Sequence, residues 1–174
     1  MSKLIEAYAN TLLGLIRPVR LQEASDVMTS YDLVGDLYLS HSGWVLLSVP
    51  NQVIKSLYDI LHVEGADLPY HSDGTLTGHI SVIRDDEMDQ VDNLELYRFL
   101  GQSYTYTLGP VRTVNPDGWD EMDQVWFVEC DSPELEAVRQ ELGLTARPKN
   151  NEFHFHITIA VRRSDESYSQ TNSR

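Results

Sequence analysis

Two tripeptides in the sequence combine a histidine with a hydroxyl two residues later: His79-Ile80-Ser81 and His156-Ile157-Thr158. Alternate residues of a strand point to the same side, so each histidine would share a face with its hydroxyl. An imidazole with an ordinary pKa of about 6.5 can accept or donate a proton near neutral pH. A hydroxyl can donate a hydrogen bond to a phosphate oxygen as charge builds on it. The set therefore suits phosphodiester cleavage without a metal, with an acid-base pair of histidines and two hydroxyls on the phosphate.

Both tripeptides lie in segments whose polar and apolar residues alternate, residues 77–83 and 153–161. This alternation is typical of a strand buried on one side. His154 shares the predicted face of His156, while Thr77 takes the equivalent place in the first segment. We therefore expect His154 to line the site or to support it rather than to transfer a proton. The remaining histidines are expected at the surface or in structural roles: His41, His62 and His71.

The chain carries the same order of elements twice. Each copy has a strand, a helix that begins beside a proline and ends near a glycine, a polar loop, and a strand with a His-x-hydroxyl motif. The copies are WVLLSVPNQVIKSLYDILHVEG followed by GHISVIR, and QVWFVECDSPELEAVRQELGL followed by FHITIAVR. The distance along the chain from Val45 to His79 nearly equals that from Val125 to His156. A duplicated unit packed about a pseudo-twofold axis would bring the polar faces of both final strands together across a cleft.

The rest of the pattern predicts further helices, strands and turns. The expected elements are an amphipathic helix at 2–16, a hairpin at 35–41 and 44–49, a solvated acidic turn and loop at 85–93, a strand at 103–108 and a mobile tail at 164–174. Asn51 and Asp131 are the expected caps of the two repeated helices. Tyr104 and Tyr106 share one face of the strand at 103–108, where they could stack a base or cover the sheet.

The paired motifs resemble those of the two-histidine (2H) phosphoesterase superfamily, and the resemblance extends from Trp44 to Arg163. Members include RNA-ligase-like 2′,3′-cyclic phosphodiesterases and phage enzymes that degrade cyclic oligonucleotide signals. The resemblance implies an α+β fold in which two antiparallel sheets surround a central cleft, with helices on the outside. The length of the chain predicts one domain, over residues 1–163, with pseudo-twofold halves at about 33–84 and 103–163. The helix at 2–16, the acidic insert and the tail lie outside what the resemblance covers.

The expected activity is metal-independent hydrolysis of a cyclic or internal phosphodiester in a small nucleotide, without a cofactor. Two substrates remain open, a 2′,3′-cyclic phosphate and a cyclic oligonucleotide signal. The base and the acid cannot be assigned, because pseudo-symmetry makes the two histidines interchangeable. An alternative from another class is a module that binds and sequesters a nucleotide without turnover. A zinc site of His79, His154 and His156, with Glu152 on the same face, is a further alternative.

Composition limits the partners of the chain. The formal net charge is -14, and long nucleic acid is held mainly by lysines and arginines that neutralise phosphates. We therefore expect a small nucleotide as the partner, and no long duplex. Four cations near the predicted cleft strands are candidates for a second phosphate: Arg84, Arg112, Arg147 and Lys149. The single cysteine, Cys130, and the lack of an apolar run of about 20 residues favour a cytoplasmic protein without a membrane partner.

Overall fold

The structure is a computed structural model that describes residues 33–61, 65–71, 73–115 and 122–164. The predicted helix at 2–16 and nearly all of the predicted tail lie outside these residues. The described elements, in chain order, are β1 (Val34–Leu39), β2 (Val45–Val49), α3 (Asn51–Leu61), β3 (Gly78–Ile83), the 3-10 helix η1 (Asp85–Gln90), α4 (Asn93–Leu96), β4 (Ser103–Thr105), β5 (Thr107–Val114), β6 (Met122–Asp131), α5 (Pro133–Glu141), α6 (Pro148–Asn151) and β7 (Phe155–Arg163).

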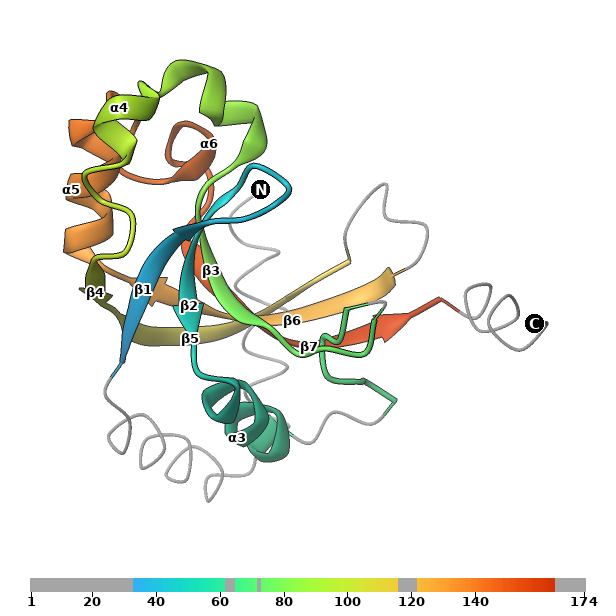
Figure 1. The fold of residues 1–174 in the computed structure, drawn as a ribbon. Helices are drawn as coiled ribbons and strands as arrows, with labels where there is room; N and C mark the ends of the chain where they lie inside the picture. The colour runs from blue at the N-terminus through green and yellow to red at the C-terminus, as the bar shows by residue number, and fades with distance from the viewer. Residues whose placement is uncertain (1–32, 62–64, 72, 116–121, 165–174) are drawn as a thin grey trace.

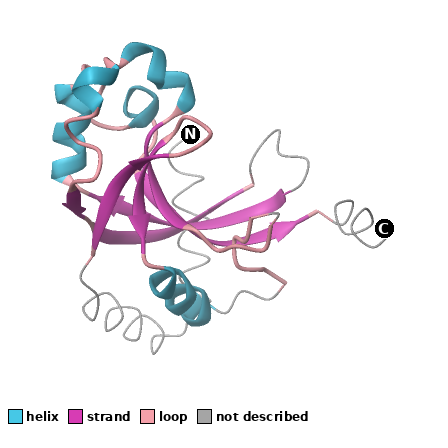
Figure 2. Cartoon of the chain, viewed as in Figure 1, coloured by secondary structure: helices cyan, strands magenta, loops and turns pink. Residues whose placement is uncertain are grey.

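The strands form two antiparallel sheets, in the orders β3-β2-β1-β4 and β5-β6-β7 (Figure 1). The predicted α+β fold of two antiparallel sheets is therefore confirmed. The helices α4, α5 and α6 gather at one end of the sheets, and α3 lies at the other end (Figure 2). None of the helices in the described part of the chain is long and apolar enough to cross a membrane.

The two strands that carry the histidine motifs, β3 and β7, are edge strands of different sheets and contact each other. The strand-helix-strand order occurs twice, as β2-α3-β3 and β6-α5-β7. Each helix packs on the motif strand of the other copy, because α3 contacts β7 and α5 contacts β3. The two copies are thus packed into each other rather than standing side by side.

One hydrophobic core joins both copies. It takes alternate residues of the motif strands, including Ile80 and Val82 from β3 and Ile157 and Ile159 from β7, all fully buried. The helices add apolar side chains at helical spacing: Val53, Ile54 and Leu57 from α3, and Leu135 and Val138 from α5. Burial of one face of each strand explains why the alternation in the sequence located both strands correctly.

A pair of cation–π contacts repeats the duplication at the strand ends. The Arg84 guanidinium lies 4.9 Å from the centre of the Trp44 ring. The Arg162 guanidinium lies 5.3 Å from that of Trp126. In each copy, an arginine near the carboxyl end of the motif strand covers a tryptophan of the adjacent strand. Trp126 lies within β6, and Trp44 is the residue just before β2. The guanidinium groups therefore cover both tryptophan rings, of which Trp126 belongs to the core.

The helix caps differ from those expected. Asn51 is the first residue of α3, and its side chain turns to the start of β3, where Nδ2 donates to the Leu76 carbonyl at 2.6 Å and Oδ1 accepts from Gly78 N at 3.0 Å. The cap of α5 is Ser132 rather than Asp131, because its hydroxyl accepts from Leu135 N at 3.2 Å. Asn51 therefore holds the segment that leads into the first motif strand.

Two predicted elements differ in the structure. The segment at 103–108 is not one strand: β4 pairs with β1 in the first sheet, and β5 pairs with β6 in the second. Tyr106 lies at the crossing between them. The acidic run at 85–93 forms η1 and the start of α4, and it is not wholly solvated, because Glu87 is buried.

Candidate active site

The side chains of both motifs emerge on the same side of the molecule. Along β3, His79 and Ser81 alternate with residues that enter the core, and His156 and Thr158 do the same along β7. Because both apolar faces enter one core and the two strands contact each other, the polar faces share one surface. All four motif side chains are half-buried.

Hydrogen bonds at the two ends of the motif strands show that β3 and β7 run in opposite directions. The carboxyl end of β3 and the loop before β7 meet at the Arg139 guanidinium, which donates hydrogen bonds to the carbonyls of Val82 and Arg147. At the other end, Asp67, in the segment before β3, forms a two-hydrogen-bond bridge with Val161, toward the end of β7. This opposite direction of the two motif strands is what a pseudo-twofold axis between the copies would produce.

The same backbone contact orients both imidazoles. Nδ1 of His79 lies 3.0 Å from the carbonyl oxygen of Thr77. Nδ1 of His156 lies 3.0 Å from that of His154. A carbonyl can only accept, so each Nδ1 must carry the proton that it donates, and the lone pair of the neutral ring is on Nε2. Each ring therefore has one nitrogen fixed and the other available for proton transfer.

The environment of His79 favours its neutral form. Burial is the largest influence and lowers the pKa of His79, and the charges of His71 and His156 lower it further. The hydrogen bond to the Thr77 carbonyl acts in the opposite direction without reversing the result. Because such effects fade over about 8–10 Å, the influence of His156 means that the two imidazoles lie near each other. His71 was expected to be a surface or structural residue, and its influence on His79 could not be seen in the spacing.

The two motif hydroxyls are available to a ligand. The hydroxyls of Ser81 and Thr158 have no hydrogen-bond partner within the described ranges. Both lie beside the imidazole of their own strand on the polar face. A half-buried hydroxyl without a protein partner is suited to donate to a phosphate oxygen.

Neighbouring strands supply two side chains that the sequence analysis did not identify, Phe127 and Glu129, and one that it did, Arg112. Across β6, Phe127 lies opposite Thr158, and Glu129 lies opposite His156. The Phe127 ring is 5.1 Å from the His156 ring, centre to centre, at a tilt of 58°. On β5, Arg112 lies opposite Phe127, and its Nε donates to Glu129 at 3.1 Å. Alternation along QVWFVEC groups Phe127 with Glu129, but only the strand register places them beside the second motif.

The first sheet differs at the matching positions. Leu46 lies opposite Ser81, and Ser48 lies opposite His79. Tyr38 lies opposite Leu46 on β1, and burial raises the pKa of its phenol. The two sides of the site thus carry the same His-x-hydroxyl motif but have different neighbouring side chains. That difference is suited to a substrate whose two sides differ.

Other predicted site residues are placed outside the motif face. His154 is exposed, and its Nδ1 accepts from Nη1 of Arg147 at 2.8 Å, so it supports His156 through its carbonyl and not through its ring. Tyr104 and Tyr106 are 8% and 2% exposed and belong to the core. Neither tyrosine leaves a ring face for a base, and their burial agrees with the other expectation, that they cover the sheet.

The zinc alternative lacks a ligand set. In the part of the chain that the structure describes, no three side chains of His, Cys, Asp or Glu are grouped so that they could hold a metal ion. The three histidines of that alternative, His79, His154 and His156, therefore do not form the expected site. The Cys130 thiol is buried and its pKa is raised mainly by that burial, so it is poorly suited to act as a nucleophile.

The four candidate cations all have protein partners. Arg84 contacts Asp86 as well as Trp44, and Arg112 contacts Glu129. Arg147 contacts Asp131 and Glu136. The Lys149 ammonium lies 5.9 Å from the centre of the Phe153 ring. Of these, only Arg112 is placed by strand register in the row of residues that crosses the second motif.

Fold and site together show a duplicated two-sheet scaffold with one histidine motif from each copy. A family model described as "2H-SAK: Swiss Army Knife, 2H phosphoesterase domain" matches residues 45–167, which is more than half of the chain. The chain therefore belongs to the 2H phosphoesterases, and phosphoester hydrolysis is the general activity of that family. No curated protein and no solved structure matches the chain.

Proposed function

We propose that this protein is a metal-independent phosphodiesterase that acts on a cyclic or internal phosphodiester of a small nucleotide. His79 and His156 are the acid-base pair, and Ser81 and Thr158 bind the phosphate. The observation that carries this proposal is the repeated motif on two touching strands. In both copies Nδ1 is tied to the backbone, and in both the hydroxyl lacks a protein partner.

The reaction needs one proton to be taken and one to be given. Water attacks phosphorus while one imidazole Nε2 takes its proton, and the P–O bond to one sugar oxygen breaks. The second imidazole, protonated at Nε2, gives its proton to that leaving oxygen, and a phosphomonoester results. The hydroxyls of Ser81 and Thr158 donate to the non-bridging oxygens as phosphorus becomes five-coordinate. Exchange of protons with solvent restores the starting state.

We assign the base to His79 and the acid to His156. A base must be neutral before it can accept a proton, and the lowered pKa of His79 keeps its imidazole neutral near pH 7. His156 is then the acid, because the reaction needs one proton to be taken and one to be given, and its ring packs against Phe127. The environment of His79 thus distinguishes two histidines that the sequence alone left interchangeable.

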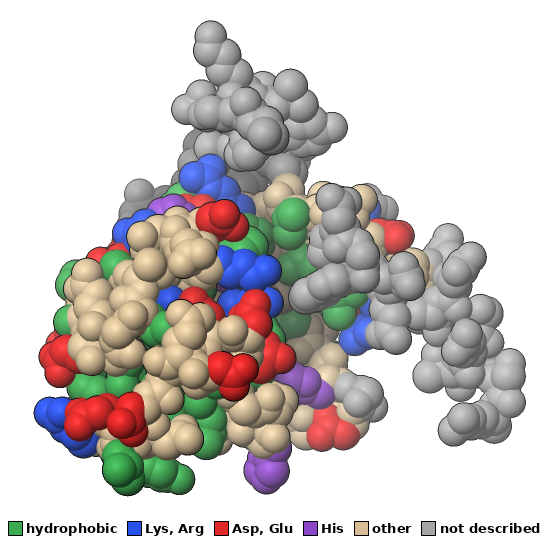
Figure 3. All heavy atoms as spheres, turned by 90° about the horizontal axis from the view of Figure 1, so that it is seen from above, with side chains coloured by type: hydrophobic (Ala, Val, Ile, Leu, Met, Phe, Trp, Pro, Cys, Tyr) green, Lys and Arg blue, Asp and Glu red, His purple; other side chains and the backbone are tan. Residues whose placement is uncertain are grey.

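A small nucleotide is the favoured substrate class. The chain has a net charge of -14, and acidic side chains are scattered over the face in Figure 3, so a long polyanion would be repelled. A compact nucleotide needs only the few donors at the motifs. Both a 2′,3′-cyclic phosphate and a cyclic oligonucleotide meet this requirement, and the choice between them is a matter for experiment.

The test is turnover of a substrate panel in the presence of EDTA. The panel contains 2′,3′-cyclic mononucleotides, cyclic dinucleotides and longer cyclic oligonucleotides, and products are followed by ³¹P NMR. We expect at least one class to be converted to a phosphomonoester with EDTA present. A ligand that binds and is recovered unchanged would favour the sequestering module, and activity lost in EDTA and restored by zinc would overturn metal independence.

A further inference from the structure

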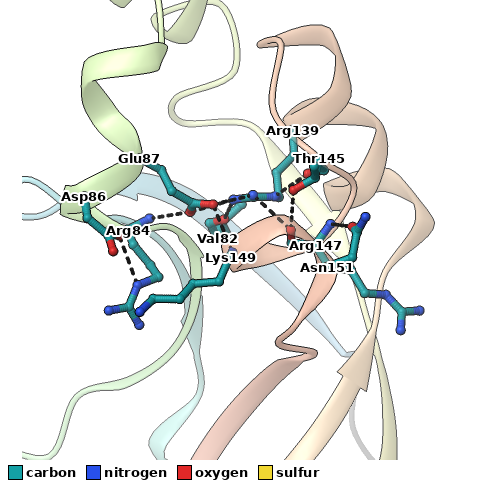
Figure 4. A network of polar contacts seen from close by, with 9 residues as sticks. All are labelled: Val82, Arg84, Asp86, Glu87, Arg139, Thr145, Arg147, Lys149 and Asn151. Carbon is teal, nitrogen blue, oxygen red and sulfur yellow. Dashed lines mark hydrogen bonds and ion pairs between the residues drawn. The ribbon is translucent and has the colours of Figure 1, made fainter.

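A buried carboxylate lies just beyond the first motif strand. Glu87, in η1, is 7% exposed and accepts four hydrogen bonds (Figure 4). Two come from the backbone, from Arg84 N at 3.2 Å and from Lys149 N at 3.1 Å. Two come from Arg139, from Nη1 at 3.0 Å and Nη2 at 2.8 Å. The Glu87 side chain therefore contacts Arg84, which follows β3, as well as Arg139 and Lys149 of the second copy.

Arg139, on α5, is fully buried and uses every donor that it has. Its Nε donates to the Thr145 carbonyl at 2.9 Å. Besides the two bonds to Glu87, Nη1 donates to the Val82 carbonyl at 2.6 Å, and Nη2 donates to the Arg147 carbonyl at 3.1 Å. A guanidinium has five N–H groups in a fixed plane, so these partners are held in one geometry.

The partners of this ion pair are the two motif strands. Val82 follows Ser81 on β3, and residues 147–149 lead into β7. The strand pairings of the two sheets do not join β3 to β7. At one end, the segment before β3 is tied to the end of β7 by the Asp67–Val161 bridge and by hydrogen bonds from the side chains of Arg162 and Arg163. At the other end, Glu87 and Arg139 tie β3 to the loop before β7.

The loop before β7 needs such a tie. Lys149, Asn150 and Asn151 have φ values of 48°, 54° and 68°, a left-handed conformation that residues other than glycine seldom adopt in succession. Glu87 holds this loop at Lys149 N, and the Asn151 side chain accepts from Arg147 N at 2.9 Å. The same loop carries the Arg147 side chain to His154, whose carbonyl fixes Nδ1 of the second motif histidine.

We propose that Glu87 and Arg139 are positioning residues that set where His156 and Thr158 lie relative to His79 and Ser81. This inference rests on the proposed phosphodiesterase function. Neither residue need touch the substrate, since both act through Val82 and the 147–149 loop. A buried ion pair adds little stability over apolar packing of equal volume, so its use here is explained by the geometry it enforces.

The first test compares E87Q and R139K with E95Q, a control that removes an exposed acid paired with Arg98 on the outside of α4. E87Q keeps the shape of the side chain without its charge. R139K keeps the positive charge without the planar guanidinium and its five N–H donors. We expect kcat to fall at least tenfold in both, with KM changed less than threefold, while circular dichroism stays native at the assay temperature. E95Q should match the wild type.

A second readout reports geometry without turnover. NMR titration should show that H156Q raises the pKa of His79 in the otherwise wild-type chain, because a neighbouring charge is removed. In the E87Q background this response should shrink, because the two imidazoles are no longer held together. An inactive wild type would defeat the proposed function, yet this titration would still decide the positioning role.

A double variant separates stability from positioning. E87M/R139M fills the same space with apolar side chains, and we expect the melting temperature to recover while kcat remains at least tenfold low. Wild-type kcat in E87M/R139M, or a His79 response to H156Q that is unchanged by E87Q, would overturn the proposal. If the double variant does not fold, E87Q and R139K decide the question alone.

Discussion

At the scale of single residues, the imidazoles of His79 and His156 and the hydroxyls of Ser81 and Thr158 supply the chemistry proposed for the site. Nδ1 of each motif histidine is committed to a carbonyl, which leaves Nε2 as the nitrogen that can move a proton. The hydroxyls of Ser81 and Thr158 add nothing to the hydrogen bonding of the described fold. The two hydroxyls can therefore be changed with little effect on folding, which makes them good targets for mutation.

Replacing either motif histidine should remove most of the activity. We expect H79Q and H156Q each to lower kcat by about 10²- to 10⁴-fold, the usual contribution of a positioned acid or base. The control is H41Q, in the exposed turn between β1 and β2, which should keep wild-type kcat. Steady-state kinetics on the substrate found in the panel makes the comparison. Normal kcat in either motif variant would remove that histidine from the mechanism.

Replacing the hydroxyls should affect the transition state but not the fold. We expect S81A and T158V each to lower kcat/KM by about 10²- to 10³-fold, as loss of one donor to a developing negative charge does. S81T and T158S keep the hydroxyl and should retain most of the activity. Thermal melting should be nearly unchanged in all four variants, because no protein hydrogen bond is lost. A large fall in melting temperature would show that the hydroxyls have structural partners.

The lowered pKa of His79 has a consequence for stability as well as for rate. The folded protein binds fewer protons at His79 than the unfolded chain does, so stability is full above the unfolded value of about 6.5 and falls as the pH drops toward the folded pKa. We expect NMR to give a His79 pKa below 6.5. Chemical denaturation from pH 7.5 to 5 should show a loss that is smaller in H79Q. A His79 pKa at or above 6.5 would contradict the assignment of the base.

At the scale of elements, the alternation of polar and apolar residues and the residues typical of helix ends predicted most of the strands and helices around the site. The predicted strands at 77–83 and 153–161 became β3 and β7, because one face of each is buried and the other is polar. The helix at Asn51 and the helix opened by Pro133 are both present. These features follow from local patterns of burial and capping, which a single sequence carries.

Features that depend on contacts between distant segments could not be predicted. The crossing at Tyr106 requires knowledge that β4 and β5 belong to different sheets. The placement of Phe127 beside His156 depends on register and on the irregularity between Trp126 and Phe127. Glu87 looked like one more residue of an acidic turn, and only its distant partner Arg139 explains its burial.

Tyr106 offers a prediction at this scale. Its hydroxyl is buried and has no hydrogen-bond partner among the residues that the structure describes, and burial raises its pKa to about 12. An unpaired buried hydroxyl costs about 1–3 kcal/mol. We expect Y106F to be as stable as the wild type or more stable by about 1 kcal/mol in chemical denaturation. Y104F is the control, because the Tyr104 hydroxyl has a partner, Gln102. A loss of stability in Y106F but not in Y104F would show that the Tyr106 hydroxyl has a hydrogen-bond partner after all.

At the scale of the whole molecule, two sheets meet along their motif edges and the surface is acidic. The strands are tied at both ends, by the Asp67–Val161 bridge and by Glu87 with Arg139, so the two motifs are held to each other rather than free to part. The net charge of -14 acts on any approaching polyanion. This surface charge is the ground on which we propose a small nucleotide, and not a long RNA, as the substrate.

Salt should therefore affect large and small substrates differently. We expect turnover of a long RNA with a 2′,3′-cyclic phosphate end to be slow at low ionic strength and to rise as added salt screens the repulsion over about 10 Å. A cyclic mononucleotide should respond much less. Initial rates from 20 to 300 mM NaCl make the comparison. A rate on long RNA that falls with salt, as counterion release predicts for a basic binder, would contradict the role given to the surface charge.

The most direct measurement is a crystal structure of the protein with the nucleoside monophosphate product of its reaction. We expect one phosphate with Nε2 of His79 and Nε2 of His156 both within about 3 Å of its oxygens, and with the hydroxyls of Ser81 and Thr158 donating to it. A phosphate bound elsewhere, or one that reaches a single imidazole while the other points away, would contradict the claim that both motifs act on one phosphorus atom.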